Sequence, residues 1–346
     1  MGGDHGPSVV VGGVKDYLAR HDGHGVRFLL HGDESAIRAE IARCGLAVET
    51  CEVRHTDKVV GMDEKPAQAM RRGKGSSLWN AVEAVKTGEA GAAVSAGNTG
   101  ALMAISKLLL RMAADGLERP AIVASWPTAR GHTAVLDVGA NIGSDAKQLI
   151  EFAIMGEAFQ AAVHGVERPT VGLLNVGSED MKGHEEVREA HAVLRAGGIP
   201  LTYHGFVEGD DIAKGTVDVV VTDGFTGNIA LKTAEGTARF ISGLLKEALT
   251  SGPLAKAGAL LAMPALRRMS QKIDPSAVNG GPLLGLNGIV VKSHGGATAR
   301  GYGNAIRVAV DLARSDYLSK VSANLDRLSV VLDETAPVEV IGETQQ

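Results

Sequence analysis

The sequence predicts an α/β protein with three layers, in which helices cover both faces of a doubly wound, mostly parallel sheet. Four segments share one pattern: a short apolar run, a loop of small residues, and then a helix. The strands expected there are residues 92–94, 135–138, 171–176 and 217–221, and the last contains the continuous apolar run 219–221. Continuous apolar runs are typical of strands that are buried on both faces. The four loops should therefore meet at the carboxyl edge of one sheet.

The composition fits a large globular chain of 346 residues, 45% of them hydrophobic. We expect one domain over residues 1–330 and a polar tail over 331–346. The net charge of −5 and the 3% of aromatic residues argue against nucleic-acid binding. Cys44 and Cys51 are expected to be buried, because two thiols make no disulfide framework. With no signal peptide and no apolar run near the ~20 residues of a membrane span, we expect a cytoplasmic or peripheral protein.

The N-terminal part begins with a polar, Gly-rich loop at residues 1–7 that no strand precedes. A helix at about 8–20, a strand at 27–30 and a helix at 35–43 should follow. Basic residues then gather in the segment 65–77, ahead of a helix at 77–87. This segment fits a solvated turn, a cationic wall beside the site, or a docking point for an acidic partner.

The middle of the chain supplies most of the repeated units. The loops 95–100, 139–143 and 177–183 each precede a helix, and a further strand is expected at 122–125. A short strand at 201–204 and a loop at 205–211 lead to the run 217–221. Small residues follow that run, and a helical pattern begins after Asn228. A strand-to-helix turn offers free backbone N–H groups and a helix dipole to an anion such as phosphate. The same residues could also serve only as tight turns.

The segment 237–269 is strongly helical and apolar, and we expect Pro253 and Pro264 to break it. Its piece 254–263 has almost no polar face. It fits a core or inter-subunit helix, or a hairpin over about 250–272 that touches a membrane surface. The last part, 280–303, is expected to be rich in loops, with a strand at 289–291 and a helix at 304–314 after it.

Several catalytic motifs are missing from the sequence. There is no G-x-S-x-G, no H-E-x-x-H and no complete G-x-G-x-x-G, so neither a metal nor a dinucleotide is indicated. The remaining loops suit a reaction in which bound phosphate is itself the nucleophile on a thioester. The same loops would also fit phosphoryl transfer or phosphosugar binding.

Six motifs together resemble the phosphate acyltransferase family of bacterial phospholipid synthesis. They lie at residues 1–7, 95–101, 136–141, 174–183, 222–228 and 292–295. The resemblance implies reversible transfer of a fatty acyl group from acyl carrier protein to inorganic phosphate, giving acyl phosphate. It implies a fold like that of phosphotransacetylases and isopropylmalate dehydrogenases, and no cofactor. It also implies a homodimer at the membrane periphery, whose product serves a membrane glycerol-3-phosphate acyltransferase.

The resemblance also assigns roles to individual residues. On matching positions it implies catalytic roles for Lys182, Asn228 and His294. Either His294 or His5 could protonate the departing thiolate. Phosphate or substrate contacts are implied for Asp4, His5, Gly97, Asn98, Thr99, Asp223, Gly227 and Lys292. Contacts with the carrier protein or the membrane are expected at Arg71, Arg72, Lys74, Arg267 and Arg268.

The chain departs from the family at its start, where the family has a short strand before the motif of residues 1–7. We expect lower stability than in a longer form; equal melting temperatures would contradict this. Three other functions stay open. They are a phosphate acetyl- or butyryltransferase that uses coenzyme A, a non-catalytic membrane scaffold, and a dehydrogenase of the same fold.

Overall fold

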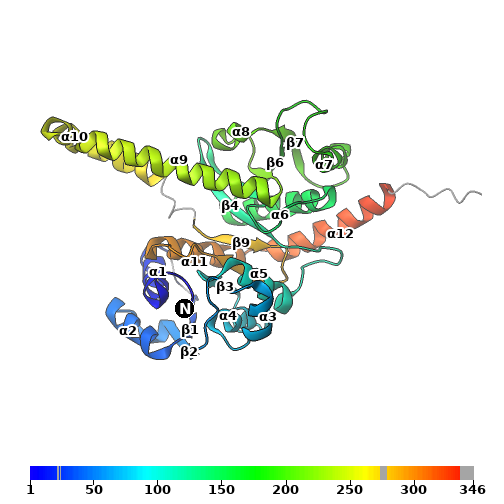
Figure 1. The fold of residues 1–346 in the computed structure, drawn as a ribbon. Helices are drawn as coiled ribbons and strands as arrows, with labels where there is room; N and C mark the ends of the chain where they lie inside the picture. Colours follow the sequence, from blue (N-terminus) through cyan, green and yellow to red (C-terminus); the bar gives the residue numbers. More distant parts are fainter. Residues whose placement is uncertain (22, 24, 273–278, 336–346) are drawn as a thin grey trace, which may run out of the picture.

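The computed structural model describes residues 1–21, 23, 25–272 and 279–335 (Figure 1). Its main sheet has eight strands in the order β3-β10-β9-β4-β5-β8-β6-β7. They are β3 (Ala92–Ser95), β10 (Ile289–Lys292), β9 (Gly281–Leu284), β4 (Ala121–Thr128), β5 (Gly131–Leu136), β8 (Val219–Val221), β6 (Thr170–Leu174) and β7 (Thr202–Val207).

The main sheet is mixed. Its two ends are parallel, β3 with β10 on one side and β5 through β7 on the other. The centre, where β9 pairs with β10 and β4 and β4 pairs with β5, is antiparallel. The predicted α/β class with a mostly parallel sheet is confirmed. The antiparallel centre was not predicted, and β9 lies in a segment expected to be mainly loop.

Helices cover both faces of this sheet, as predicted. One face packs against α6 (Ala146–His164), α7 (Glu185–Ala196), α11 (Ala299–Arg314) and α12 (Tyr317–Thr335). The opposite face is covered in two halves. The half at β3, β10 and β9 packs against α4 (Ser77–Lys86) and α5 (Thr99–Leu110), and the other half lies under α8 (Gly209–Lys214) and α9 (Gly224–Thr250). Helix α6 is buried over most of its length, which places it at the centre of the largest core.

The N-terminal helices enclose a smaller core. Helix α1 (Gly6–Arg20) packs against α11 and α2 (Glu34–Cys44), and β1 (Phe28–Gly32) pairs in parallel with β2 (Cys51–His55), which the short 3-10 helix η1 (Val48–Thr50) precedes. Cys44 and Cys51 are both buried here, as predicted. These two strands form a sheet of their own, and a cavity of about 650 Å³ separates β1 from β3. The expected gain in stability from a longer N-terminus stays a prediction.

Several predicted boundaries were wrong. The segment 65–77, in which no helix was predicted before residue 77, contains helix α3 (Pro66–Arg72). The predicted loop at 205–211 is divided between the end of β7 and α8. Helix α11 begins five residues before the predicted start. Helix α12 was not predicted and runs past residue 331, while residues 336–346 of the predicted tail lie outside the described residues.

A helical hairpin is present, but it begins well before the predicted range of about 250–272, which holds little more than its second helix. Helices α9 and α10 (Pro253–Lys272) lie side by side and project from the body of the molecule (Figure 1). Pro253 separates the two helices as expected, but Pro264 lies inside α10 and does not break it. This part of α10 is exposed, so water can satisfy the carbonyl group that loses its partner. Within the described residues, no helix combines the length and apolar character that crossing a membrane requires.

Candidate active site

A cavity of about 480 Å³ lies between β4 and α9 and has a polar mouth. Four predicted site residues, Thr99, Asn228, Lys292 and His294, line it together. They come from the N-termini of α5 and α9 and from the end of β10. The inner wall is mainly apolar. It includes Ile122, Ala124, Trp126, Val138, Leu231, Ala234 and Ala238.

The pairing of β10 explains how these polar residues meet. Lys292 pairs with Ser95 at the end of β3 on one side and with Gly281 of β9 on the other. The next residue continues this contact, since the Ser293 amide donates to the Ser95 carbonyl at 2.8 Å. The loop after β3 therefore places Thr99 beside Lys292. Two segments nearly 200 residues apart in sequence thus share one sheet edge.

Burial lowers the pKa of Lys292 to about 8, and the negative charge of Asp4 opposes this shift. Its ammonium group donates to the Ser293 carbonyl. Asp4 reaches this place because its backbone amide donates to the Gly295 carbonyl at 3.2 Å. The N-terminal loop thus folds against the loop after β10. Near neutral pH the mouth of the cavity holds a cation that is partly removed from water.

His294 stands at the mouth, and its side chain is 61% exposed. Its Nε2 lies 3.8 Å from Oε1 of Glu235, and the other Glu235 oxygen accepts from Lys232 Nζ at 2.9 Å. Glu235 is a site residue that was not predicted from the sequence. The signal was present, since residue 235 lies seven positions after Asn228 and falls on the same face of a helix.

Asp137 organises the floor of the site, although it was not among the predicted site residues. Its carboxylate is fully buried and accepts from the amides of Ile122, Gly139, Ala140 and Asn141 and from the Asn141 side chain, at 2.6–3.2 Å. Burial raises the pKa of Asp137, and these hydrogen bonds oppose the rise. One side chain therefore fixes the loop after β5 against β4.

Helix α9 begins directly on this loop. A Cβ atom on Gly227 would lie 2.0 Å from the Asp137 carbonyl oxygen, and one on Gly224 would lie 2.2 Å from the Asn141 carbonyl oxygen. Only glycine permits this approach. The same contact places Asn228 near Gly139, where a Cβ atom would be 3.5 Å from the Asn228 side chain. Gly227 thus has a packing role, and its predicted substrate contact stays a prediction.

Two other predicted contacts have side chains that are already engaged. Asn98 is 8% exposed; its amide group donates to the carbonyls of Gly61, Met62 and Glu64 at 2.8–3.1 Å, and its oxygen accepts from Ala101 N. Asp223 caps α9 and accepts from the amide and hydroxyl groups of Thr226 at 2.9 and 2.7 Å. The geometry gives both residues positioning roles.

The asparagines of the four loops therefore differ in whether their side chains are already hydrogen-bonded to the backbone. Asn98 and Asn141 hold backbone carbonyls, and Asn175 donates to the Lys182 carbonyl at 3.0 Å. Asn228 makes no side-chain hydrogen bond within the described residues, and it faces the cavity. It is the loop asparagine that remains available to a ligand.

Lys182 lies on the exposed loop after β6 and is not among the residues that line this cavity in the described chain. Its aliphatic stem covers Gly177, and Asp180 on the same loop pairs with Arg195 of α7 at 3.2 Å. The other predicted residues lie in the N-terminal part of the fold. Gly97 is buried against Leu78, and His5 lines a separate cavity of about 100 Å³.

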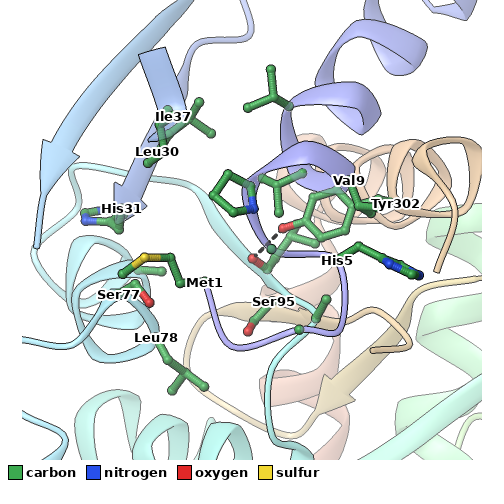
Figure 2. Close-up of a pocket in the computed structure, with 18 of the residues that line it drawn as sticks. Met1, His5, Val9, Leu30, His31, Ile37, Ser77, Leu78, Ser95 and Tyr302 are labelled. Atoms are coloured by element: carbon green, nitrogen blue, oxygen red, sulfur yellow. Dashed lines mark hydrogen bonds between the residues drawn. The ribbon is translucent and has the colours of Figure 1, made fainter. Parts of the chain in front are cut away.

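Figure 2 shows that separate cavity behind the N-terminal loop, with Met1, His31 and Ser95 around it. The Tyr302 hydroxyl closes one side by donating to the Val94 carbonyl at 3.0 Å. The cavity is lined largely by core side chains. His5 lines this small cavity and is not among the residues that line the cavity of about 480 Å³ with Lys292.

The two predicted basic groups lie on different elements. Arg71 and Arg72 end α3 and Lys74 follows, whereas Arg267 and Arg268 belong to α10 of the hairpin (Figure 1). All five are exposed. No cluster of His, Cys, Asp and Glu that could hold a metal ion occurs in the described ranges.

The fold belongs to a known class. It is similar to a phosphotransacetylase from Streptococcus pyogenes, with a TM-score of 0.58, 18% identity, and coverage of 89% of this chain and 92% of that one. It is also similar to the EutD phosphotransacetylase from Staphylococcus aureus, with a TM-score of 0.54, 15% identity, and coverage of 89% and 99%. At this identity the likeness defines the α/β architecture alone.

The sequence comparisons identify the family. A protein-family model described as "Fatty acid synthesis protein" matches residues 1–320. The phosphate acyltransferase of Caulobacter vibrioides is 70% identical over 95% of this chain and 91% of the relative. That of Phenylobacterium zucineum is 63% identical over 97% and 95%. The chain belongs to the fatty acid synthesis protein family, and the predicted acyltransferase class is confirmed.

Proposed function

We propose that this chain transfers a fatty acyl group from acyl carrier protein to inorganic phosphate and releases acyl phosphate for phospholipid synthesis. The observation that carries the proposal is the cavity between β4 and α9, whose mouth holds Lys292 and Asn228 and whose wall is apolar. A phosphate ion suits the mouth and an acyl chain suits the wall. The phosphate acyltransferase relatives support the same reaction.

The chemistry requires no group beyond those at the mouth. An oxygen of bound phosphate attacks the thioester carbon, the C–O bond forms, and the C–S bond breaks. The thiolate leaves with the electron pair and takes a proton from solvent or from the protonated form of His294, whose pKa is lowered by burial. Lys292 holds the phosphate and offsets its charge, and the Asn228 amide donates to the oxygen that becomes negative. Thr99, at the N-terminus of α5, adds a hydroxyl group and free amides.

The acyl chain lies along β4 in this proposal. From Ile122 to Trp126 the strand advances about 13 Å, since each residue adds about 3.3 Å. Leu231, Ala234 and Ala238 of α9 form the facing wall. The apolar length of the cavity therefore favours a fatty acyl group over an acetyl group, which separates this function from a short-chain transferase that uses coenzyme A.

The hairpin supports the proposal of a homodimer at the membrane surface. Along α9, Phe240, Ile241 and Leu244 are more than half exposed, and near the start of α10 Leu254 is 87% exposed. Such apolar area needs a cover. A second copy covers α9, and Leu260 and Leu261 on α10 contact lipid in a cytoplasmic, peripherally bound enzyme beside the glycerol-3-phosphate acyltransferase. Sedimentation with anionic vesicles tests this proposal. A monomer that does not sediment with the vesicles would refute it.

The decisive experiment measures phosphate-dependent release of carrier protein from palmitoyl-acyl carrier protein, with acyl phosphate trapped by hydroxylamine. Wild-type chain should require phosphate, and Lys292→Ala should lose most turnover. Lys86→Ala, an exposed lysine in the last turn of α4, is the matched control. A scaffold protein would show no release, and a dehydrogenase would need a nicotinamide cofactor. Release without phosphate would contradict the proposal.

A further inference from the structure

A basic surface adjoins the mouth of the cavity. It is formed by the segment 57–74, which includes the loop before α3, helix α3 and the turn after it. This segment carries five basic and three acidic residues, in a chain whose net charge is −5. A local excess of positive charge on an acidic protein attracts negatively charged partners selectively.

The basic side chains at the end of this segment form no ion pair with another described residue. Arg71, Arg72 and Lys74 are exposed, and none has a carboxylate within ion-pair distance in the described part of the chain. Elsewhere helical cations commonly pair one turn away, as Arg38 does with Glu34 and Arg307 with Asp311. Unpaired charges can pair with a partner without first breaking a contact.

The same surface carries apolar side chains. Val59, Met62 and Met70 are 43%, 45% and 37% exposed. Methionine adapts its shape to a partner, and both methionine and arginine are enriched at protein interfaces. Apolar anchors beside free cations are typical of a surface that binds an acidic protein, whereas a site for a small anion would not need them.

This surface is continuous with the mouth. The Asn98 side chain holds the carbonyls of Gly61, Met62 and Glu64, and the next residue, Thr99, lines the cavity. On the other side, a Cβ atom on Gly295 would lie 3.4 Å from the Met62 terminal methyl, one residue beyond His294. A protein seated here would present an acyl arm between Thr99 and His294.

We propose that this surface, the α3 face (Val59, Met62, Met70, Arg71, Arg72 and Lys74), docks the acidic donor protein, and that Arg267 and Arg268 of the hairpin do not. The inference rests on the proposed function, because it names where that donor binds. The buried Asn98 then has a second role. By holding the loop 61–64, its side chain joins the docking surface to the cavity.

The chain offers a matched pair of variants, because each candidate surface contains two adjacent arginines. Arg71→Glu/Arg72→Glu is compared with Arg267→Glu/Arg268→Glu, using palmitoyl-acyl carrier protein and palmitoyl-pantetheine as donors. Pantetheine carries the thioester without protein or phosphate. The α3 variant should lose about tenfold to a hundredfold in kcat/KM with the carrier donor, mainly through KM and most strongly at low salt. With palmitoyl-pantetheine it should change by less than about twofold.

Each other outcome has a definite meaning. Equal losses with both donors would show that the α3 face serves the fold or the chemistry, and a loss confined to Arg267→Glu/Arg268→Glu would place docking on the hairpin; either overturns the inference. Met62→Ser/Met70→Ser tests it without a charge change and should also raise KM for the carrier donor alone. Wild-type turnover with palmitoyl-pantetheine but not with the carrier donor would refute the proposed donor itself.

Discussion

Replacing Gly227 by alanine tests how the start of α9 positions the site. The added Cβ atom would lie 2.0 Å from the Asp137 carbonyl oxygen and 2.9 Å from the Thr222 methyl group, where ordinary contacts are 3.4–4 Å. Backbone on both sides must therefore separate by more than about 1 Å. Overpacking of this kind costs about 1–3 kcal/mol of unfolding free energy. The helix propensity of alanine returns up to about 1 kcal/mol.

The matched control lies on the same helix. A Cβ atom on Gly236 of α9 would have no neighbouring atom within 4 Å, so Gly236→Ala should stabilise the chain by up to about 1 kcal/mol and leave turnover unchanged. Gly227→Ala should lose tenfold to about a hundredfold in kcat/KM, because an error of about 1 Å in positioning Asn228 is sufficient. Urea unfolding and the hydroxylamine assay measure the two effects. Wild-type stability and activity in Gly227→Ala would refute this account of α9.

Three further outcomes follow from the site. Because burial lowers the pKa of Lys292 to about 8, the ammonium form dominates below that pH, and kcat/KM for phosphate should fall as pH rises through about 8. A kcat/KM that stays constant up to pH 10 would exclude a role for the Lys292 ammonium group. Asp4→Asn should move the midpoint of this pH profile lower, because the negative charge of Asp4 raises the pKa of Lys292. Trp126→Leu shortens a side chain in the cavity wall and should shift preference toward longer acyl chains; an unchanged profile across C12 to C18 donors would remove Trp126 from the acyl site.

The main elements of the fold were predictable because they follow from local patterns. Residues 219–221 are fully buried in β8, as expected of an apolar run inside a sheet. Helix α2 begins after Asp33, which caps it, and its C-cap is Gly45 in the left-handed conformation. Such signals depend on a few neighbouring residues. They located most strands and the order of the loops.

Other features depended on distant contacts and could not be predicted from local patterns. Helix α3 is short, and its stability comes from packing on α5, where Pro66 approaches Gly100. Strand β9 is bounded by Gly280 and Gly285, both with positive φ, and its pairing with β4 joins residues about 160 positions apart. The role of Asp137 likewise rests on partners in β4 and α9. The motif that contains Asp137 was visible in the sequence, but the burial of the Asp137 carboxylate was not.

Whether the Gly and Asn residues of the four loops bind an anion or only form turns has a different answer for each residue. Where the side chain is engaged by the backbone, as in Asn98, Asn141 and Asn175, the residue builds the turn. Asn228 is different. Gly227 lets the start of α9 approach the Asp137 backbone closely, and the Asn228 side chain then lies at the cavity mouth that Lys292 also lines. In three loops the asparagine side chain thus holds backbone in place, and this division favours α9 and β10, beside Thr99, as the position of the proposed phosphate site.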